Sequence, residues 1–548
     1  MSDNLSLLAS KKGWIPELFE SISNIAENTS KDRDDQLRSI AEKFLMGPAN
    51  TLGTLSFYDH FNPDHLNKKI FVCNGTACLV SGTQQDLRNK LNDHINDQEI
   101  GEMCCLGRCH ENSAFHYQGI NYSGKDVAEI EKILTGSKNL SKDTYQVRSA
   151  LKDPVLTHEN DFEHYKRLFN SLLEKDVQEV LEEIKCSKLR GRGGAGFSTG
   201  DKLEACKVQQ SYPKFLVCNA DEGDPGSYSD RYLLEEQPHA VWFGMLIAAR
   251  VIGAEHAIVY IRAEYPESIQ SMESARDLWV TFLSDLIKEN KLAPLNPKIV
   301  KGAGSYICGE ESALLSSLEG QRPEVRIRPP YPTESGLFLK PTVVNNVETL
   351  ANIPYILQHG AAAYKKLGTN QTPGVKLICL DGLFNQPGIV EVAMGTQLDE
   401  VIYTWGGGFK MPVKALQIGG PLGGIVPISQ TKKLTIDYES FKSNGFDLGH
   451  ASIVSIPESF PMIKYLEHLF EFTAHESCGK CAPCRIGSIR GKELIKEAQS
   501  SKASLQLLKD LLETLEQGSL CGLGKTLPLP VVNALSYFDK ELEPYFGD

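Results

Sequence analysis

The residues best suited to chemistry are cysteines near the end of the chain. Cys478, Cys481 and Cys484 follow one another at intervals of three residues, and Cys521 comes much later. Three thiols in one tight turn can bind a metal centre that a distant fourth thiol completes, which is the spacing typical of a [4Fe-4S] cluster. A structural zinc site is the alternative, although zinc prefers two closely spaced pairs. The spacing therefore favours a [4Fe-4S] cluster.

A second set of cysteines lies nearer the start of the chain. Cys73 and Cys78 form one pair, and Cys105 and Cys109 form another, with Cys104 as an alternative to Cys105. Two pairs suit a [2Fe-2S] cluster, although the spacing is not that of plant-type ferredoxins. Zinc is a stronger competitor here than at the other set. Ordinary buried thiols are expected of the remaining cysteines, which are Cys186, Cys206, Cys218, Cys308 and Cys379.

A dense glycine run, R-G-R-G-G-A-G-F, occupies residues 190–197. Glycines let a ligand lie directly against the backbone, and the amides of such a loop can bind anionic oxygens. The run lacks the spacing of the common dinucleotide fingerprint and follows no clear strand. By itself it predicts a phosphate- or ring-binding loop, with a plain flexible loop as the alternative.

Three more segments carry polar groups that suit a bound cofactor. They are C-N-A-D-E-G-D-P-G at residues 218–226, Y-I-C-G-E-E at 306–311 and P-T-V-V-N-N-V-E-T at 341–349. The first lies at a predicted strand end, where α/β folds bind ligands, and the third precedes a predicted helix, whose first turn attracts phosphate. Each could be a capped turn, but four such segments in one region predict a cofactor site.

Short elements of alternating type must position the front cysteines. Apolar residues at helical intervals predict helices over 15–25 and 35–44, and a strand at 70–72 and a helix over 84–94 follow. Residues 136–142 read as a polar linker. The expected regions are a helical segment (1–65) and a small α/β domain (66–140).

A larger α/β region must position the glycine loop and its companions. Strands at 215–217 and 257–261 alternate with helices over 241–251 and 267–289, as in βαβ units. A glycine-rich stretch without long helical patterns follows, and the tail is helical apart from its cysteine loops. The expected domains are an α/β domain (145–373), a β-rich domain (374–455) and a helical domain (456–548).

Composition and charge limit the classes of function. The 548 residues include 57 Lys or Arg and 70 Asp or Glu, and the net charge of −13 argues against a nucleic-acid-binding face. The most apolar stretch, residues 240–249, is much shorter than the roughly 20 residues of a membrane-spanning helix. The first residues lack a cationic and apolar leader, so we expect a cytoplasmic protein whose 14 cysteines are reduced and include metal ligands.

Taken together, the motifs resemble one family over almost the whole chain. R-G-R-G-G-A-G-F, C-N-A-D-E-G-D-P-G, Y-I-C-G-E-E, N-N-V-E-T and S-C-G-K-C-A-P-C-R are similar to motifs of the NADH-binding flavoprotein subunit shared by respiratory complex I and soluble NAD-linked hydrogenases and formate dehydrogenases. The front third resembles the small thioredoxin-like [2Fe-2S] subunit, with its helical head at residues 13–16 and 56–61. The resemblance implies a multidomain α/β fold that consists of a helical head, a thioredoxin-like [2Fe-2S] domain, a Rossmann-like FMN and NAD domain, a β-grasp insert including residues 419–424 and a C-terminal helical bundle carrying [4Fe-4S].

The resemblance also implies which residues bind the cofactors. FMN would be held by Gly191, Gly193, Gly194, Lys202, Asn219, Asp221, Glu222, Gly309, Glu310, Asn345 and Asn346, with Arg192, Ala195, Gly196 and Thr349 completing the site. NAD(H) would stack over the flavin, with Phe197 and Tyr331 at the adenine, Glu311 at the ribose and Arg328 at the phosphates, although core packing is the alternative for the two aromatic residues. The predicted catalytic residues Asp224, Glu310 and Glu311 would act as positioning and electrostatic groups.

Departures from the family's pattern bear on the type of complex. Leu203 and Ala205 stand where the family usually has aromatic residues, so one adenine-stacking ring is expected to be missing. Asp224 stands where complex I usually has glutamate, and Arg328 where lysine is common. An arginine can still bind phosphate through two hydrogen bonds. Together with the fused front domain, these differences favour the soluble hydrogenase or formate dehydrogenase type.

We therefore predict a diaphorase, the NAD(H)-oxidising and -reducing subunit of a soluble multisubunit oxidoreductase. A nicotinamide carries two electrons as hydride, iron–sulfur clusters accept one at a time, and a flavin can do both. The chain has no recognisable hydrogen- or formate-activating site, so other iron–sulfur and catalytic subunits must supply it. The alternatives are an electron-input subunit of complex I, a non-catalytic electron-relay subunit and a zinc-stabilised binding module.

Overall fold

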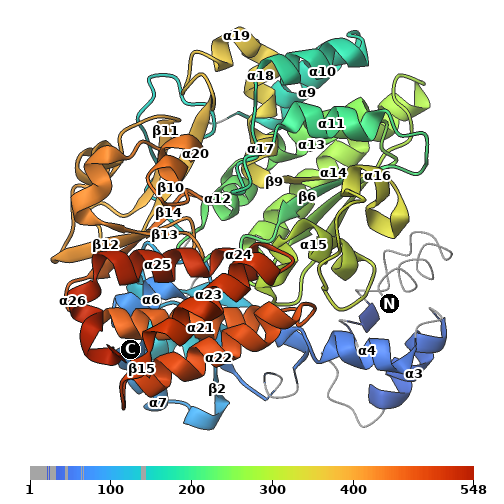
Figure 1. Cartoon of the computed structure of the whole chain (residues 1–548). Coiled ribbons are helices and arrows are strands. Elements are labelled where there is room, and N and C mark those ends of the chain that lie inside the picture. The colour runs from blue at the N-terminus through green and yellow to red at the C-terminus, as the bar shows by residue number, and fades with distance from the viewer. Residues whose placement is uncertain are drawn as a thin grey trace. The chain divides into compact units, whose positions relative to one another are not determined.

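Two compact units make up the chain in the computed structural model (Figure 1), which describes residues 21–22, 24, 33–43, 47–62, 65, 67–137, 143–158 and 160–547. The motif at 13–16 and most of the helix predicted over 15–25 lie outside the described residues. The first unit contains residues up to Asn67, Leu151–Glu222 and Ser229–Val375. The second contains Lys68–Ala150, Gly223–Tyr228 and the chain from Lys376 onward.

A four-stranded parallel sheet forms the centre of the first unit. Its order is β8 (Asn296–Lys301), β7 (His256–Ile261), β6 (Phe215–Ala220) and β9 (Thr342–Asn346). The strands predicted at 215–217 and 257–261 are confirmed. The helices predicted beside them are confirmed as α13 (Pro238–Ile252) and α14 (Pro266–Lys288).

The strand order reverses at β6, since β7 lies on one side of it and β9 on the other. In open parallel sheets, ligands bind at the carboxyl ends of the strands at this position. The pairing register places Cys218 beside Asn345 and Asn219 beside Asn346. Polar side chains from two separate sequence motifs therefore end neighbouring strands at the place where a ligand is expected.

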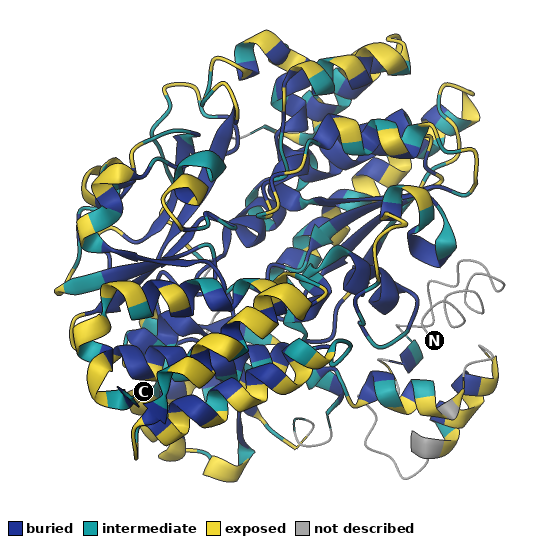
Figure 2. Cartoon of the chain, viewed as in Figure 1, coloured by how far each residue is buried: buried dark blue, intermediate teal, exposed yellow. Residues whose placement is uncertain are grey.

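Alternate residues of β6 face opposite sides of the sheet. Phe215 and Val217 belong to a buried cluster with Leu314 and Leu318 of α15 (Glu311–Leu318). Leu216 points to the other face, which α13 contacts. Figure 2 shows β6 and β7 mostly in dark blue, the colour of buried residues. Helices on both faces therefore keep the sheet rigid beneath the polar strand ends.

The described part of the helical head packs on the α15 side of this sheet. It consists of α3 (Arg33–Lys43), α4 (Pro48–Leu55) and the 3₁₀ turn η1 (Asp59–Phe61). Leu55, Tyr58 and Phe61 are buried in the same cluster as Val217. This segment resembles the head of a [2Fe-2S] subunit by sequence, but its packing makes it part of the first unit.

The second unit opens with a four-stranded mixed sheet. The order is β2 (Ile100–Met103), β1 (Ile70–Cys73), β3 (Phe115–Tyr117) and β4 (Ile120–Tyr122), with β1 and β2 parallel and the other pairs antiparallel. Two helices follow β1, α6 (Thr76–Val80) and α7 (Gln84–Asn92). The strand at 70–72 and the helix over 84–94 are confirmed.

A six-stranded sheet forms the middle of this unit. Its order is β13 (Gly424–Pro427), β12 (Val413–Ile418), β14 (Ser452–Pro457), β10 (Val375–Leu380), β11 (Gly388–Ala393) and β5 (Arg148–Ser149). β5 pairs in parallel with β11, and the Arg148 guanidinium donates hydrogen bonds to the carbonyl oxygens of Trp405 at 2.7 Å and Gln386 at 2.8 Å. Two residues far earlier in the chain therefore add an edge strand to this sheet.

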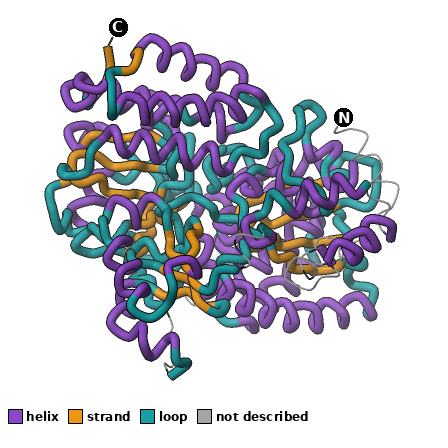
Figure 3. Tube along the Cα trace, turned by 90° about the horizontal axis from the view of Figure 1, so that it is seen from below, coloured by secondary structure: helices purple, strands orange, loops and turns teal. Residues whose placement is uncertain are grey.

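Helices form most of the C-terminal part of the second unit. They are α21 (Met462–Glu476), α22 (Ala482–Ala498), α23 (Leu505–Gly518), α24 (Gly522–Thr526), α25 (Pro528–Tyr537) and α26 (Asp539–Leu542), and Figure 3 shows purple helices beside the C-terminus. Gly491 lets α22 approach α21 closely, because a Cβ there would collide with the Phe470 ring. Across the described residues, no helix combines the length and apolar character needed to cross a bilayer.

Candidate functional site

A short antiparallel bridge between Arg190 and Ser198 closes the glycine run into a loop. The Gly191 amide donates to the Phe197 carbonyl oxygen at 2.8 Å, and Arg190 Nε donates to the Gly196 carbonyl oxygen at 2.7 Å. Gly196 has φ of +59°, a backbone conformation that residues with a Cβ atom rarely adopt. The run is therefore a loop held by its own hydrogen bonds, and it leads directly into α11 (Thr199–Lys207).

Arg192 supports this loop from the inside. Its side chain is fully buried, and Nη2 donates to the Pro373 carbonyl oxygen at 2.6 Å and to the Tyr364 hydroxyl at 3.2 Å. The Arg192 amide donates to Thr349 Oγ1 at 2.8 Å. The sequence predicted cofactor contacts for Arg192 and Thr349, and the structure shows that these two residues tie the loop to the helix that follows β9.

The polar groups at the ends of β6 and β9 fit FMN. Asn345 is 6% exposed, and its Nδ2 has no hydrogen-bond partner among the described residues. A Cβ on Gly193 would lie 3.1 Å from Asn346 Cβ, and one on Gly309 would lie 3.2 Å from the Asp221 carbonyl oxygen. The two glycines therefore let the motifs approach one another closely. A buried donor without an acceptor suits a ligand that carries carbonyl and phosphate oxygens.

The two acidic residues after β6 have different surroundings. The Asp221 amide donates to Asn219 Oδ1 at 3.1 Å, and Asn219 Nδ2 donates to the Gly309 carbonyl oxygen at 2.8 Å. These bonds connect the second and third motifs. Glu222 is buried, and its carboxylate accepts the Arg231 amide at 3.0 Å at the beginning of α12 (Ser229–Glu236). Glu222 therefore stabilises a helix start, whereas Asp221 lies with the predicted site residues.

Two cations and two carboxylates form an ion-pair network near the end of β9, where Lys202 Nζ donates to the Val344 carbonyl oxygen. Lys202 Nζ lies 3.3 Å from Glu311 Oε2, and Arg328 Nη1 lies 3.2 Å from Glu311 Oε1. Arg328 also pairs with Glu310, which accepts the Ser312 amide at 2.9 Å and so caps α15. Because each cation is held by a carboxylate near the surface, an incoming phosphate can replace part of this pairing.

Two exposed aromatic rings could stack on the adenine base, and a third expected position has none. Phe197 and Tyr331 are 58% and 55% exposed, so their rings are free to stack on a flat ligand. Leu203 is fully buried, and Ala205 is exposed on the same helix. Ala205 is therefore the position where the expected stacking ring is missing, because its exposed side chain is only a methyl group.

Asp224 belongs to the second unit, not to the first. A Cβ on Gly420 would overlap its carboxylate, so this carboxylate lies against the turn that follows β12. The Asp224 carbonyl oxygen accepts the Ser227 amide at 2.9 Å. The predicted electrostatic role of Asp224 in the reaction stays a prediction.

The front cysteines converge within the second unit. All four predicted ligands are buried, and Cys105 Sγ lies 3.4 Å from Cys109 Sγ. Hydrogen bonding to the Cys105 thiol, reinforced by burial, raises the pKa of both Cys73 and Cys109. Cys78 contributes in the same direction at Cys73. The structure therefore gathers buried thiols as a metal site requires, and it brings Cys105 rather than the half-buried Cys104 into the group.

A buried ion-pair cluster lies directly beside Cys109. Arg108 and His110 both contact Asp143. Burial opposes ionisation of this carboxyl, but the hydrogen bond from His110 and the charge of Arg108 hold the pKa of Asp143 well below its ordinary value. His110, Glu111 and Asp143 lie close enough to hold a metal ion. Arg108 and Lys125 already neutralise these carboxylates, so the cluster is better explained as support for the Cys105–Cys109 loop.

The C-terminal cysteines gather at a helix start. Cys481 directly precedes α22, and Cys484 lies in its first turn, where the helix dipole favours negative charge. Burial raises the pKa of Cys484 to about 11, and Cys481 and Cys478 act in the same direction. Cys521 directly precedes α24, and a Cβ on Gly524 of that helix would lie 3.0 Å from Cys484 Cβ. The fold therefore brings the helix that follows Cys521 against the three-cysteine turn.

A hydrogen bond between the two cysteine regions has no signal in the sequence. Thr76, which lies between Cys73 and Cys78, has its Oγ1 3.0 Å from Nε2 of His468. His468 belongs to α21, the helix that leads into Cys478. One helix therefore contacts both ligand loops, a relation that local residue patterns cannot show.

The scattered cysteines divide into two groups. Burial is confirmed for Cys206, Cys218, Cys308 and Cys379. The prediction for Cys186 is wrong, because this residue is exposed at the end of α10 (Val177–Cys186). Its position lies off the buried face that Val180, Leu181 and Ile184 form on that helix.

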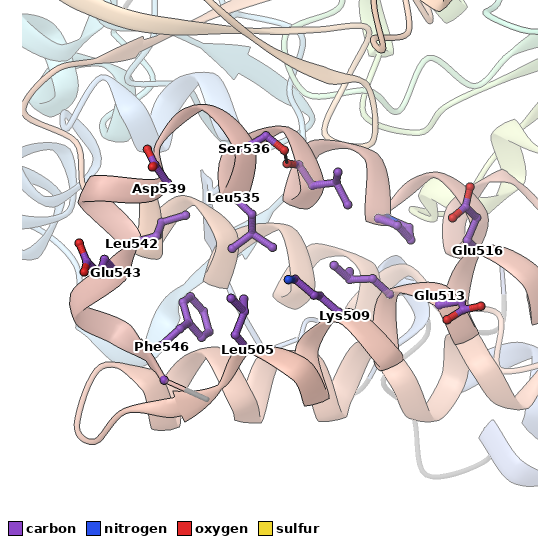
Figure 4. Close-up of a pocket in the computed structure, with 14 residues that line it drawn as sticks. Leu505, Lys509, Glu513, Glu516, Leu535, Ser536, Asp539, Leu542, Glu543 and Phe546 are labelled. Carbon is purple, nitrogen blue, oxygen red and sulfur yellow. Dashed lines mark hydrogen bonds between the residues drawn. The ribbon is translucent and has the colours of Figure 1, made fainter.

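A groove of about 790 Å³ lies between α23, α25 and α26 (Figure 4). Leucines and Phe546 form its walls, and acidic residues such as Glu513 and Glu543 lie at its edges. No cysteine or histidine occurs among the described residues that line it. The groove is therefore not a site for either cluster.

Sequence models of three families match the chain. "Nuo51 FMN-binding domain" matches residues 184–355, "NADH-ubiquinone oxidoreductase-F iron-sulfur binding region" matches 464–545, and "Thioredoxin-like [2Fe-2S] ferredoxin" matches 33–138. These matches cover the glycine loop and the polar strand ends, the C-terminal cysteines and the front cysteines, in that order.

Individual relatives are similar over much or all of the chain. NADP-reducing hydrogenase subunit HndC of Solidesulfovibrio fructosivorans is 41% identical over 378 residues, which are 68% of this chain and 76% of that protein. A NADH-quinone oxidoreductase subunit of Rhizobium meliloti is 38% identical, over 69% of this chain and 91% of that protein. NAD-reducing hydrogenase HoxS subunit alpha of Cupriavidus necator is 30% identical, over 92% of this chain and 88% of that protein.

A solved structure is similar over almost the full length. In the crystal structure of a NAD⁺-reducing [NiFe]-hydrogenase in the air-oxidised state, one chain matches with a TM-score of 0.85 and 29% identity, over 97% of this chain and 94% of that chain. Fold, site and relatives together define a class, the NAD(H)-dependent oxidoreductases that use FMN and iron–sulfur clusters. The chain belongs to the family that contains these NADH-quinone oxidoreductase and NAD-linked hydrogenase subunits, and it carries a fused thioredoxin-like [2Fe-2S] domain. The predicted multidomain fold and the predicted cofactors FMN, NAD(H), [4Fe-4S] and [2Fe-2S] are confirmed at the level of the family.

Proposed function

We propose that this chain is the diaphorase subunit of a cytoplasmic multisubunit oxidoreductase, which exchanges electrons between NAD(H) and a second active site on other subunits. The observation that carries the proposal is the buried side chain of Asn345 near the end of β9, whose Nδ2 has no hydrogen-bond partner among the described residues. Within each of the two sets of cysteines, thiols lie close to one another. A flavin site and two cluster sites in one polypeptide support electron transfer from a nicotinamide.

A hydrogenase or a formate dehydrogenase is the second activity that we propose for the complex. Relatives whose names describe NAD- and NADP-reducing hydrogenase subunits support the first of these. The match to HoxS subunit alpha includes 92% of this chain, whereas the match to the Rhizobium meliloti protein includes 69%. The fused front domain therefore favours a soluble NAD-linked complex over complex I.

FMN, when bound, supplies the chemistry that links the two-electron nicotinamide to one-electron clusters. The chain's own residues bind and orient. Gly191 leaves space beside the backbone, Gly193 lets the loop approach Asn346 closely, and Nδ2 of Asn345 provides a buried hydrogen-bond donor. Lys202 and Arg328 bind phosphate groups, and Glu310 and Glu311 set the positions of these cations through the observed ion pairs. Phe197 and Tyr331 stack on the adenine, as their exposure allows.

The cysteines would bind the clusters, and the surrounding groups would affect the charge of each cluster site. Cys73, Cys78, Cys105 and Cys109 would bind the [2Fe-2S] cluster, and Cys478, Cys481, Cys484 and Cys521 would bind the [4Fe-4S] cluster. The first turn of α22 places helix-start dipoles beside the C-terminal set. Arg108, next to Cys109 in the sequence, pairs with Asp143 and so supports the Cys105–Cys109 loop.

A second candidate function is a non-catalytic electron-relay subunit, which the exposed Ala205 favours because it provides no stacking ring. Equilibrium binding of NADH distinguishes the two functions. A diaphorase binds NADH and is reduced by it, whereas a relay subunit is reduced only by another protein or a chemical reductant.

The test is NADH-driven reduction of benzyl viologen by the anaerobically purified chain. We expect activity in the wild type and at least a tenfold loss, with loss of flavin, in Asn345→Leu, which keeps the side-chain size but removes the amide. Asn444→Leu is the matched control, because Asn444 is exposed at the end of α20 (Tyr438–Ser443) in the second unit. A flavin-loaded wild type that neither binds NADH nor reduces the viologen would favour the relay function.

A further inference from the structure

The segment that carries residues 309–311 of the nucleotide site is held at its beginning by the helical head. The backbone amides of Asp59 and His60 donate hydrogen bonds to the carbonyl oxygens of Gly304 and Ala303, each at 3.1 Å. Gly304 has φ of +79°, and a Cβ there would lie 2.7 Å from the His60 ring. The head backbone therefore lies directly against this segment.

One side chain of the head makes the contact at the other end of the segment. Tyr58 is fully buried, and its hydroxyl donates to Ser317 Oγ at 2.7 Å. The hydroxyls of Ser317 and Tyr260 lie 2.9 Å apart, so Ser317 links the head to β7. Thr54 Oγ1 lies 3.5 Å from the Gly320 carbonyl oxygen, just beyond α15. The head thus contacts both ends of a segment whose middle residues belong to the predicted nucleotide site.

Tyr58 also lies beside Cys308, the residue directly before Gly309. Burial, together with the neighbouring Cys308, raises the pKa of Tyr58 well above its ordinary value, so its hydroxyl stays protonated and donates a hydrogen bond. Asp221 acts electrostatically on Tyr58, Tyr260 and Cys308. A buried group of hydroxyls and a thiol therefore connects the head to Asp221 and Gly309, two of the predicted FMN residues.

We propose that Tyr58 is a positioning residue for the flavin and nucleotide site, which acts through Ser317 and Cys308 to fix the backbone of residues 309–311. The inference rests on the proposed function. The family model over residues 33–138 joins the head to the thioredoxin-like domain, whereas the contacts above join its described part to the flavin domain. Loss of the Tyr58 hydroxyl should therefore change nucleotide binding and leave the [2Fe-2S] cluster unchanged.

The test compares Tyr58→Phe with the wild type in the full-length chain. Removing one net hydrogen bond of ordinary strength should raise the FMN dissociation constant and the KM for NADH about 3- to 10-fold, with kcat within twofold. The electron paramagnetic resonance signal of the reduced [2Fe-2S] cluster should not change. Tyr117→Phe is the matched control, since it removes the hydroxyl that donates to the Leu134 carbonyl oxygen at 3.4 Å in the thioredoxin-like domain.

Two further measurements separate positioning from general destabilisation. Ser317→Ala should have the same effect as Tyr58→Phe, and the double variant should be no worse than either single one, because both remove the same link. Backbone hydrogen exchange of residues 303–321 should be several-fold faster in Tyr58→Phe than in Tyr117→Phe, with or without flavin. Unchanged FMN affinity and exchange in Tyr58→Phe would overturn this inference. A wild type that binds no FMN would instead overturn the proposed function, and the exchange comparison would still decide the role of Tyr58.

Discussion

Adding a methyl group at Gly191 tests whether a flavin lies on the glycine loop. A Cβ built at this position has the Phe197 carbonyl oxygen at 3.6 Å and the Phe197 amide nitrogen at 3.8 Å as its nearest neighbours, which are ordinary contact distances. The backbone of Gly191 is also outside the left-handed region. Gly191→Ala should therefore fold normally, and any effect on flavin must come from a ligand that occupies the space above the loop.

The size of the effect follows from overpacking. A methyl group forced into an occupied space typically costs about 1–3 kcal/mol. Since about 1.4 kcal/mol corresponds to a factor of ten in a dissociation constant, FMN binding should weaken about 5- to 150-fold. The thermal unfolding of the flavin-free protein should stay within a few degrees of the wild type.

The assay is titration of the flavin-free chain with FMN, followed by flavin fluorescence. Gly53→Ala is the control, because no atom lies within 4 Å of a Cβ at Gly53 and this residue lies within α4. It should leave FMN affinity unchanged. Equal FMN affinity in Gly191→Ala and the wild type would refute the placement of FMN on this loop, and strong destabilisation of flavin-free Gly191→Ala would refute the steric reasoning.

Three other predictions concern the nucleotide, a buried histidine and the front cysteines. Ala205→Phe should lower the KM for NADH about 2- to 10-fold by adding a stacking ring, whereas Ala205→Leu should have a smaller effect; an unchanged KM in the phenylalanine variant would contradict the missing-ring interpretation. Burial lowers the pKa of His468 to about 4 despite the opposing charge of Glu471, so the imidazole is neutral in the folded protein. Above the unfolded pKa of about 6.5 the histidine is neutral in both states and does not reduce the free energy of unfolding. As the pH falls, protonation favours the unfolded chain, and the free energy of unfolding should decrease by up to about 2 kcal/mol at pH 5. His468→Gln should therefore flatten the decline in melting temperature between pH 7 and pH 5, and an unchanged slope would show that other groups cause it. Cys105→Ser should abolish the [2Fe-2S] resonance signal and Cys104→Ser should keep it; the reverse result would exchange the two assignments.

The sequence predicted the elements that depend on local patterns. β6 was expected at 215–217 and extends to Ala220, because parallel pairing with β7 and β9 continues through the polar Asn219. Helices α13 and α14 were predicted from their apolar periodicity, and their proline starts and the glycine that ends α13 fit that prediction. The cysteine spacing likewise predicted both candidate quartets, because thiol pairs and triplets are local features.

Relations between distant parts of the chain could not be predicted. No local pattern shows that residues 148–149 form an edge strand beside β11 or that Thr76 contacts His468. The bonds from the Asp230 and Arg231 amides to the Glu222 carboxylate also had no signal in the sequence, and the expected place of Glu222 at the cofactor stays a prediction. The head was expected as a separate segment (1–65) that resembles part of the [2Fe-2S] subunit, and the burial of Tyr58 with residues of α15 reveals its packing on the flavin domain.

Cofactor content before and after NADH tests the central claim most directly. The anaerobically purified chain should contain about six iron atoms, about six acid-labile sulfides and one FMN, and NADH should bleach the flavin and generate iron–sulfur resonance signals. A chain with stoichiometric zinc, no iron and no yellow chromophore under the same conditions would contradict the account.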